Sequence, residues 1–157
     1  FLMVLGYVDT SPDGDVQTWY GKEGQVLRLR QGRILSSKGF PVDWTTVTYT
    51  DLPDWTTATS RPRVRFVRYR DETPGYKVGV FNIVTLRRIE TPTDARLSGI
   101  PPSSLLWVEE TTDISPRGRP SARYGLKMIG ERYGVVYGEQ CLSTQFCMAW
   151  QTWPATP

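Results

Sequence analysis

Residues 25–40, with the sequence Q-V-L-R-L-R-Q-G-R-I-L-S-S-K-G-F, form the strand–turn–strand pattern that constrains the fold most. Leucine and arginine alternate in its first half, with the period of two that is typical of a half-buried strand. Gln31 and Gly32 predict a turn, after which the extended pattern resumes. A two-residue loop would place Leu29 opposite Ile34 on one face. A three-residue loop with Gly32 as a bulge is the alternative, because Gln-Gly is a weaker turn former than Asn-Gly.

Short extended segments separated by Gly, Pro, Asp and Ser clusters continue along the 157 residues. No helical apolar stripe exceeds two turns, and no internal repeat is convincing. Further strands are expected at 1–8, 16–20, 61–70, 76–90, 105–112, 122–131 and 133–139. Residues 41–58 are expected as a broken strand or ordered loop, 140–153 as a strand or short helix, and 91–104 and 113–121 as loops. The sequence therefore predicts an all-β fold: one antiparallel domain over 1–157, with about eight to ten strands in a barrel or strongly curved sheet.

Charge and hydropathy limit the possible partners. The 19 basic and 16 acidic residues give a formal charge of +3, which suits an acidic polymer, although this charge is too diluted to favour nucleic acid. No window of about 18 apolar residues is present, as a membrane-spanning helix requires. The longest apolar run, Phe1 to Val8, lacks the basic segment and cleavage site of a signal peptide and is expected to be a strand. Because the chain starts abruptly without methionine, we expect a leader upstream of Phe1.

The chain contains no histidine, which excludes Ser-His-Asp and Cys-His catalysis and a Cys/His zinc site. Glu109 and Glu110 are adjacent carboxylates, but neighbours on a strand point to opposite faces and cannot flank one bond. No phosphate-binding loop, dinucleotide-binding or calcium-binding motif occurs. We therefore expect no catalytic residues, no metal site and no cofactor.

The two cysteines, Cys141 and Cys147, are separated by five residues. A strand–turn or a short helical turn can bring them within the distance that a disulfide needs. In an exported chain a disulfide is expected, whereas in a cytosolic chain two buried free thiols are expected.

Arginines supply the candidate binding residues for an anionic glycan or lipid headgroups: Arg28, Arg30, Arg61, Arg63 and Arg65. In 61–70, the arginines at 61, 63 and 65 share one face, and the alternation is expected to shift at Val67. A solvated edge strand that is guarded by positive charge explains the same pattern. Trp19 is a candidate for stacking on sugars, although tryptophan at strand spacing is also typical of a core.

Two segments carry a resemblance to a known family. The segment L-M-V-L-G-Y-V-D and the later T-W-Y-G-K-E-G-Q-V-L-R-L-R-Q-G-R-I-L-S-S-K-G-F resemble the YjbF/GfcB family of bacterial lipoproteins. That family has an L-x-x-A/G-Y strand, a Trp-bearing strand and a G-R-h-h-x-T/S-x-G-L/F hairpin, where h is apolar. Downstream, V-V-Y-G and Gln140 lie where the family has a strand before S-x-Q. The specific match covers Leu2 to Phe40, and the cysteine-bearing tail departs from the enteric members.

The resemblance implies a lipoprotein acylated on a cysteine upstream of Phe1, anchored to the bacterial outer membrane and facing the periplasm. Members are encoded with proteins for exopolysaccharide or group 4 capsule production, have no assigned enzymatic activity and are predominantly antiparallel β. An exported setting also favours a bond between Cys141 and Cys147. We expect a non-enzymatic accessory protein of polysaccharide secretion whose partners are export or assembly proteins or an anionic glycan. The alternatives are a carboxylate-dependent glycan-active enzyme and a lipid-carrying periplasmic β-barrel.

Overall fold

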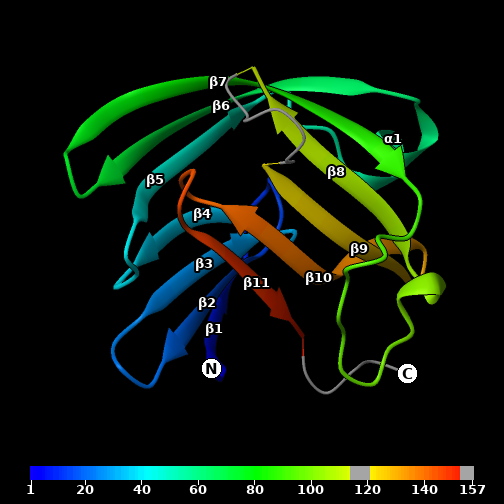
Figure 1. Cartoon of the computed structure of the whole chain (residues 1–157), viewed down its shortest axis with the longest axis horizontal. Helices are drawn as coiled ribbons and strands as arrows, with labels where there is room; N and C mark the ends of the chain where they lie inside the picture. Colours follow the sequence, from blue (N-terminus) through cyan, green and yellow to red (C-terminus); the bar gives the residue numbers. More distant parts are fainter. Residues whose placement is uncertain (114–120, 153–157) are drawn as a thin grey trace. The chain divides into compact units, whose positions relative to one another are not determined.

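The computed structural model describes residues 1–113 and 121–152 (Figure 1). Its strands are β1 (Met3–Asp9), β2 (Val16–Gly21), β3 (Val26–Arg30), β4 (Arg33–Lys38), β5 (Asp43–Thr50), β6 (Val64–Thr73), β7 (Lys77–Ile89), β8 (Leu106–Thr112), β9 (Ala122–Ile129), β10 (Arg132–Cys141) and β11 (Cys147–Gln151). A short helix α1 (Trp55–Ser60) and a 3-10 turn (Pro102–Ser104) complete the described elements. The predicted all-β antiparallel fold class is confirmed.

The described strands number eleven, slightly more than predicted, because both ambiguous segments contribute a strand. The segment 41–58 supplies β5 and the start of α1, and 140–153 supplies β11. The loop expected at 91–104 is confirmed, whereas residues 114–120 of the second expected loop lie outside the described residues. Among the described helices, none has the length and apolar character needed to cross a membrane.

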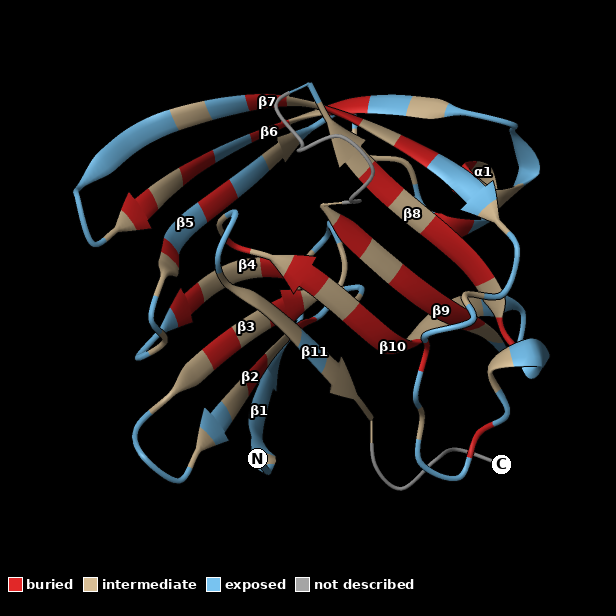
Figure 2. Ribbon diagram, in the orientation of Figure 1, coloured by how far each residue is buried: buried red, intermediate tan, exposed pale blue. Residues whose placement is uncertain are grey.

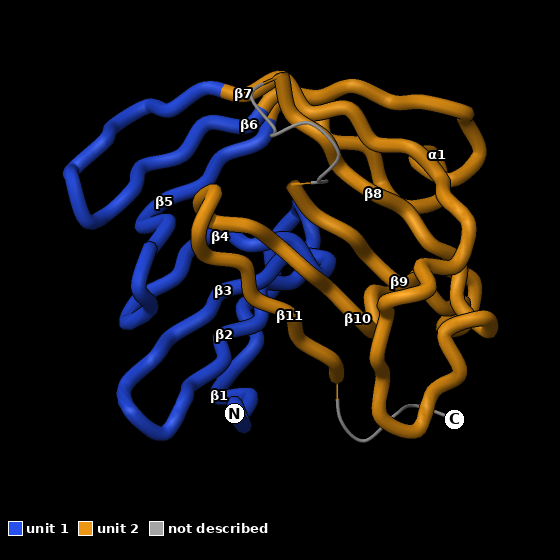
Figure 3. The backbone as a smooth tube through the Cα atoms, viewed as in Figure 1, with its two compact units in different colours: residues 1–49, 68–81 blue, residues 50–67, 82–157 orange. Residues whose placement is uncertain are grey.

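The strands form two sheets, in which nearly every strand pairs with its neighbours in sequence. The four-stranded sheet has the order β1-β2-β3-β4, and the seven-stranded sheet has the order β11-β10-β9-β8-β7-β6-β5. The chain divides into two compact units, residues 1–49 with 68–81, and residues 50–67 with 82–157 (Figure 3).

The β3–β4 hairpin has the two-residue loop that the sequence predicts. Gln31 and Gly32 both have positive φ, at 51° and 77°, which suits the right-handed twist of the flanking strands. Leu29 pairs with Ile34, and both side chains are buried. The register shifts next to this pair: Leu29 pairs with Ile34, but Arg28 pairs with Ser36, so β4 has one extra residue, Leu35, at this point.

An aspartate fixes the turn from β4 into β5. The Asp43 carboxylate accepts hydrogen bonds from the Ser37 hydroxyl at 3.0 Å and from the backbone N–H groups of Gly39 at 2.8 Å and Phe40 at 3.2 Å. The Ser37 hydroxyl in turn accepts one from the Trp44 N–H at 2.9 Å. These bonds satisfy turn groups that the strands cannot pair, and they place Trp44 at the start of β5.

Strand β6 corrects one expectation from the sequence. The predicted shift at Val67 is wrong: the alternation continues, and Arg68, Arg70 and Glu72 are buried. The guanidinium carbons of Arg68 and Arg70 lie 4.7 and 4.9 Å from the centre of the Trp44 ring. Arg70 Nε also donates to Glu72 Oε1 at 2.7 Å. Two cations can occupy the interior of this unit because an aromatic face and a carboxylate receive them.

In the second unit, both faces of β8 are covered. Its neighbouring residues Trp107 and Val108 point to opposite faces and are both buried. Figure 2 shows buried, red segments along β8 and the adjacent β9. On one face the 91–104 connection packs over Trp107, whose indole N–H donates to the Pro102 carbonyl at 2.8 Å. The long loop is therefore part of the core of this unit.

Candidate functional site

The strand registers divide the four-stranded sheet into two faces, since residues directly opposite each other share a face. The face that we call the tyrosine–arginine face consists of Val4, Tyr7 and Asp9 on β1, Val16, Thr18 and Tyr20 on β2, Val26, Arg28 and Arg30 on β3, and Arg33, Ser36 and Lys38 on β4. Its residues all belong to the unit of 1–49 and 68–81.

Two tyrosines expose their rings on this face. Tyr7 is 48% exposed and Tyr20 is 44% exposed, and their ring centroids lie 6.5 Å apart. The Tyr20 ring covers Gly6, where an added Cβ would collide with the ring carbons Cε2 and Cδ2. Gly6 lies in the register irregularity between Leu5 and Tyr7. The missing side chain of Gly6 therefore lets Tyr20 lie against the backbone of β1.

Arg28 and Thr18 face each other beside the two rings. Arg28 Nη2 lies 3.9 Å from Asp9 Oδ2, and both side chains are about half exposed, so this ion pair is weak. Thr18 is 1% exposed, and among the described residues neither its hydroxyl nor Arg28 Nε has a hydrogen-bond partner. Buried polar atoms are nearly always satisfied in native proteins. Both atoms are buried, so the part of this pair that an incoming anionic group can reach is the Arg28 side chain, which is 43% exposed.

The charge of the tyrosine–arginine face is mainly positive. Its charged members are four cations and one carboxylate, Asp9. Arg33 is buried and Lys38 is exposed, while Arg30 Nη1 lies 3.6 Å from Asp13 of the loop before β2. Desolvation, followed by the influence of Tyr7, raises the pKa of Tyr20 above its usual value. Tyr20 is therefore a neutral hydrogen-bonding group at neutral pH, beside exposed cations.

The structure brings together some of the binding residues proposed from the sequence and separates others. Arg28 and Arg30 lie side by side on the tyrosine–arginine face. Trp19 lies on the other face of the sheet, opposite Leu5 and Leu27, and its indole N–H bonds to Gln17 Oε1 at 3.3 Å.

The other arginines and the cysteines belong to the second unit. Arg61, Arg63 and Arg65 are exposed, the first two before β6 and the third on it. Cys141 and Cys147 form a disulfide between residues that pair at the end of the β10–β11 ladder.

Sequence reasoning missed Tyr7, Thr18 and Tyr20. Tyr7 belongs to the apolar run 1–8, a pattern that predicts a strand but not a binding residue. The irregularity at Gly6 decides that Tyr7 rather than its neighbour faces Thr18, and no local pattern indicated that register. One signal in the sequence could have indicated the Tyr7–Tyr20 pair. Each of the first two expected strands contains a tyrosine, and the third contains arginines.

The adjacent carboxylates lie on opposite faces, as the sequence predicts. Glu109 pairs with Arg87 and Arg123 across the neighbouring strands and accepts a hydrogen bond from Arg87 Nε at 2.7 Å. Glu110 is buried on the other face, opposite Leu86. Within residues 1–113 and 121–152, no group of three or more Cys, Asp or Glu side chains could hold a metal ion.

These carboxylates are engaged in the sheet, whereas the tyrosine–arginine face presents exposed aromatic and cationic groups to solvent. A surface of this composition can bind a ligand with an apolar ring face and an anionic substituent. No protein-family model, no curated protein and no solved structure matches the chain.

Proposed function

We propose that this protein is a non-enzymatic accessory lipoprotein of exopolysaccharide or capsule secretion, and that it binds an anionic glycan on the tyrosine–arginine face. The observation that supports the proposal is the exposed Tyr7–Tyr20 pair beside Arg28 and the buried Thr18 hydroxyl. The stretch that resembles the YjbF/GfcB lipoproteins, 2–40, contains all four strands of this sheet. The segment that resembles the family and the candidate binding face therefore involve the same residues.

The chemistry of the face suits an acidic sugar polymer. The apolar face of a sugar ring packs against an aromatic ring, while a uronate carboxylate forms charge-assisted hydrogen bonds with a guanidinium. Arg28 is available for this because its pairing with Asp9 is long and exposed. Binding should combine stacking, which resists salt, with ion pairing, which weakens with salt.

The test compares an uncharged glucan with a polyuronate by isothermal titration calorimetry. Tyr20→Ala and Arg28→Gln are each expected to weaken polyuronate binding about tenfold, equivalent to roughly 1.4 kcal/mol. Tyr69→Ala is the matched control, because Tyr69 is 43% exposed and its ring centroid lies 5.4 Å from that of Phe81 in the same unit. Arg65→Gln tests the other group of arginines.

Equal affinity for both polymers, or unchanged affinity in Tyr20→Ala and Arg28→Gln, would rule out glycan binding on this face. If Arg65→Gln alone abolished binding, the site would be at Arg61, Arg63 and Arg65 of the second unit. If no polyuronate bound but an export or assembly protein were retained through Arg28, the face would be a protein-binding surface. Metabolic labelling of the host with a fatty-acid analogue tests the proposed lipid anchor separately. If the protein purified from the outer-membrane fraction carried no label, the anchor would be contradicted.

A further inference from the structure

The turn between β6 and β7 exposes large apolar side chains to an unusual degree. Tyr76 is 87% exposed and Val78 is 80% exposed, with Lys77 between them. Neither apolar side chain contributes burial to the core of its unit. We call Tyr76, Lys77 and Val78 the hairpin tip.

The acidic residues of this hairpin are bound internally. Glu72 is buried and contacts Arg70 at 2.6 Å and Lys77 Nζ at 3.3 Å. Asp71 is half-buried and accepts a hydrogen bond from the Gly79 N–H at 2.7 Å. Lys77 keeps 66% of its side chain exposed. The tip therefore presents two exposed apolar side chains and, between them, a largely exposed ammonium that also pairs with Glu72.

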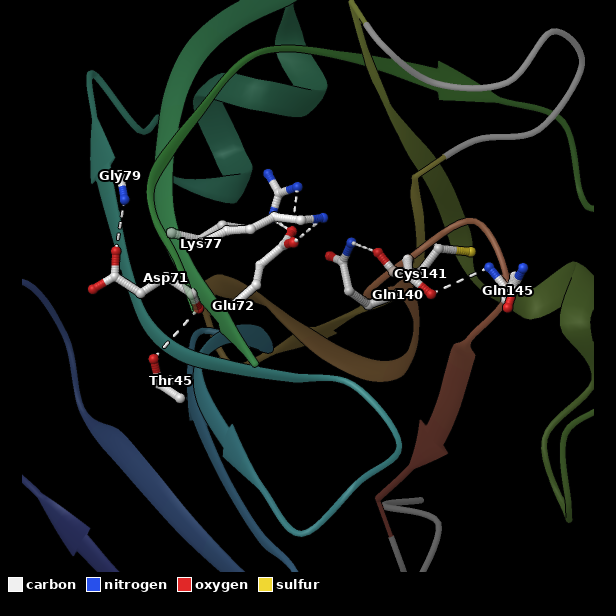
Figure 4. Close-up of polar contacts among 10 residues, drawn as sticks. Thr45, Asp71, Glu72, Lys77, Gly79, Gln140, Cys141 and Gln145 are labelled. Carbon is white, nitrogen blue, oxygen red and sulfur yellow. Dashed lines mark hydrogen bonds and ion pairs between the residues drawn. The ribbon is translucent and has the colours of Figure 1, made fainter. Parts of the chain in front are cut away.

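Hydrogen bonds connect the residues that flank the tip. The Asp71 carboxylate spans the hairpin to Gly79, and the Asp71 carbonyl accepts from the Thr45 hydroxyl at 3.4 Å, as Figure 4 shows. Gly79 adopts φ of 64°, a conformation that glycine takes at no steric cost. A preorganised tip loses little conformational entropy when it binds.

The small size of the tip favours a lipid bilayer over a folded protein as its partner. An aromatic side chain buries about 150–250 Å², so Tyr76 and Val78 together offer on the order of 300 Å². A stable protein interface needs about 800 Å² on each side. Insertion into a bilayer has no such threshold, because each apolar side chain contributes independently and tyrosine favours the interface between headgroups and acyl chains. A lysine beside it pairs with anionic headgroups.

We propose that the hairpin tip inserts into the interfacial region of a bilayer that contains anionic phospholipid, with Tyr76 and Val78 in the acyl boundary and Lys77 at the headgroups. This contact is separate from the tyrosine–arginine face and from any N-terminal lipid. It would orient the unit of 1–49 and 68–81 against a membrane by a second point of attachment.

The test is flotation of the 157-residue chain with vesicles of phosphatidylcholine alone or with added phosphatidylglycerol. The double variant Tyr76→Ser/Val78→Ser is expected to lower partitioning into both vesicle types at least tenfold. Lys77→Gln should lower only the preference for anionic vesicles, by about fivefold. The matched control is Met128→Ser/Ile129→Ser, since these residues are 49% and 50% exposed near the β9–β10 turn, and it should partition as the parent chain does.

A labelled thiol measures depth directly. Because both cysteines are joined in a disulfide, Val78→Cys supplies a unique thiol for an environment-sensitive fluorophore, whose emission should shift to the blue on vesicles. The same label at Ile129→Cys should not shift. Partitioning that vanishes at high salt, or that Arg28→Gln reduces as much as the tip variant does, would show surface attraction only and overturn the proposal. Concentration-dependent dimerisation that Tyr76→Ser/Val78→Ser abolishes would instead identify a second copy as the partner.

Discussion

Arg68 places its guanidinium carbon 4.7 Å from the centre of the Trp44 ring, and both residues are buried. Arg70 approaches the same ring at 4.9 Å, and burial, followed by the repulsion from Arg68, lowers the pKa of Arg70. The interior of this unit therefore holds two like charges around one indole. Glu72 offsets part of that charge through its contact with Arg70.

Trp44 is expected to stabilise the fold through Arg68 as well as through its own burial. Trp44→Ala should lower the free energy of unfolding by about 3–5 kcal/mol. In a double-mutant cycle of Trp44→Leu with Arg68→Met, the coupling energy should be about 1–2 kcal/mol, because the desolvated cation loses its aromatic face. Chemical denaturation of the parent chain, the two single variants and the double variant measures this coupling energy. A coupling near zero would show that the ring acts by volume alone.

The Tyr7 hydroxyl is expected to tune the ionisation of Tyr20. Desolvation is the larger cause of the raised Tyr20 pKa, and Tyr7 adds to it through charge and hydrogen bonding. Tyr7→Phe should therefore move the Tyr20 pKa toward 10, its ordinary value, without reaching it. NMR of ring-labelled tyrosine follows the titration. An unchanged Tyr20 titration in this variant would disprove the coupling.

The same titration predicts a pH dependence for the face. Because the folded-state pKa of Tyr20 is raised, the associated stability is present below about pH 10 and is lost as the pH rises through the folded value. Ionised Tyr20 would also repel an anionic ligand. Polyuronate binding should therefore fall in that alkaline range, whereas binding that stays constant through the Tyr20 titration would place the ligand elsewhere.

Gly6 is expected to be needed for the position of Tyr20. A Cβ in Gly6→Ala would overlap the Tyr20 ring, so the ring must turn away from β1. We expect a loss of stability of about 1–3 kcal/mol from the steric conflict and polyuronate affinity as low as in Tyr20→Ala. Gly24→Ala is the control for a glycine substitution without crowding, since an added Cβ there meets no atom within 4 Å. Because Gly24 has φ of 85°, this variant is expected to lose stability through backbone strain but to keep the polyuronate affinity of the parent.

Asp94 fastens the long loop of the second unit to β9. Its carboxylate accepts two hydrogen bonds from Arg123, at 2.7 and 2.9 Å, and Arg123 also bonds to Glu139 at 2.9 Å. The hydrogen bonds from Arg123 are the main cause of the lowered Asp94 pKa. A lowered pKa means that the stabilisation is present above about pH 4 and is lost as the pH falls through the folded-state value.

Asp94→Asn is therefore expected to cost about 0.5–1 kcal/mol at neutral pH, a modest value because Asp94 is 66% exposed. Thermal denaturation between neutral and acidic pH should show the parent chain converging on the variant in acid. Glu131→Gln, at an exposed turn position, should run parallel to the parent throughout. If the difference between Asp94→Asn and the parent persisted at the lowest pH, the ion pair would not be its source.

The hairpins that were predicted correctly depend on short-range sequence signals. The period of two and the Gln31-Gly32 turn determined the β3–β4 hairpin, because both depend only on neighbouring residues. The β9–β10 hairpin followed from the same signals. Segments 41–58 and 140–153 lack such signals, and each is compatible with a strand and with another structure. Whether they form β5 and β11 depends on pairing with strands that the local sequence does not specify.

The sequence by itself thus determined the all-β class, the main hairpins and the separation of Glu109 from Glu110, which all follow from alternation along a strand. Tertiary structure decided which face each strand presents. It placed Trp19 away from Arg28, and it brought Tyr7 and Tyr20 together through the irregularity at Gly6. It also buried Arg68 and Arg70 on β6, where the alternation was expected to shift. A one-residue change in register exchanges the faces of a strand, so side chains meet as cross-strand pairing dictates rather than as spacing along the chain suggests.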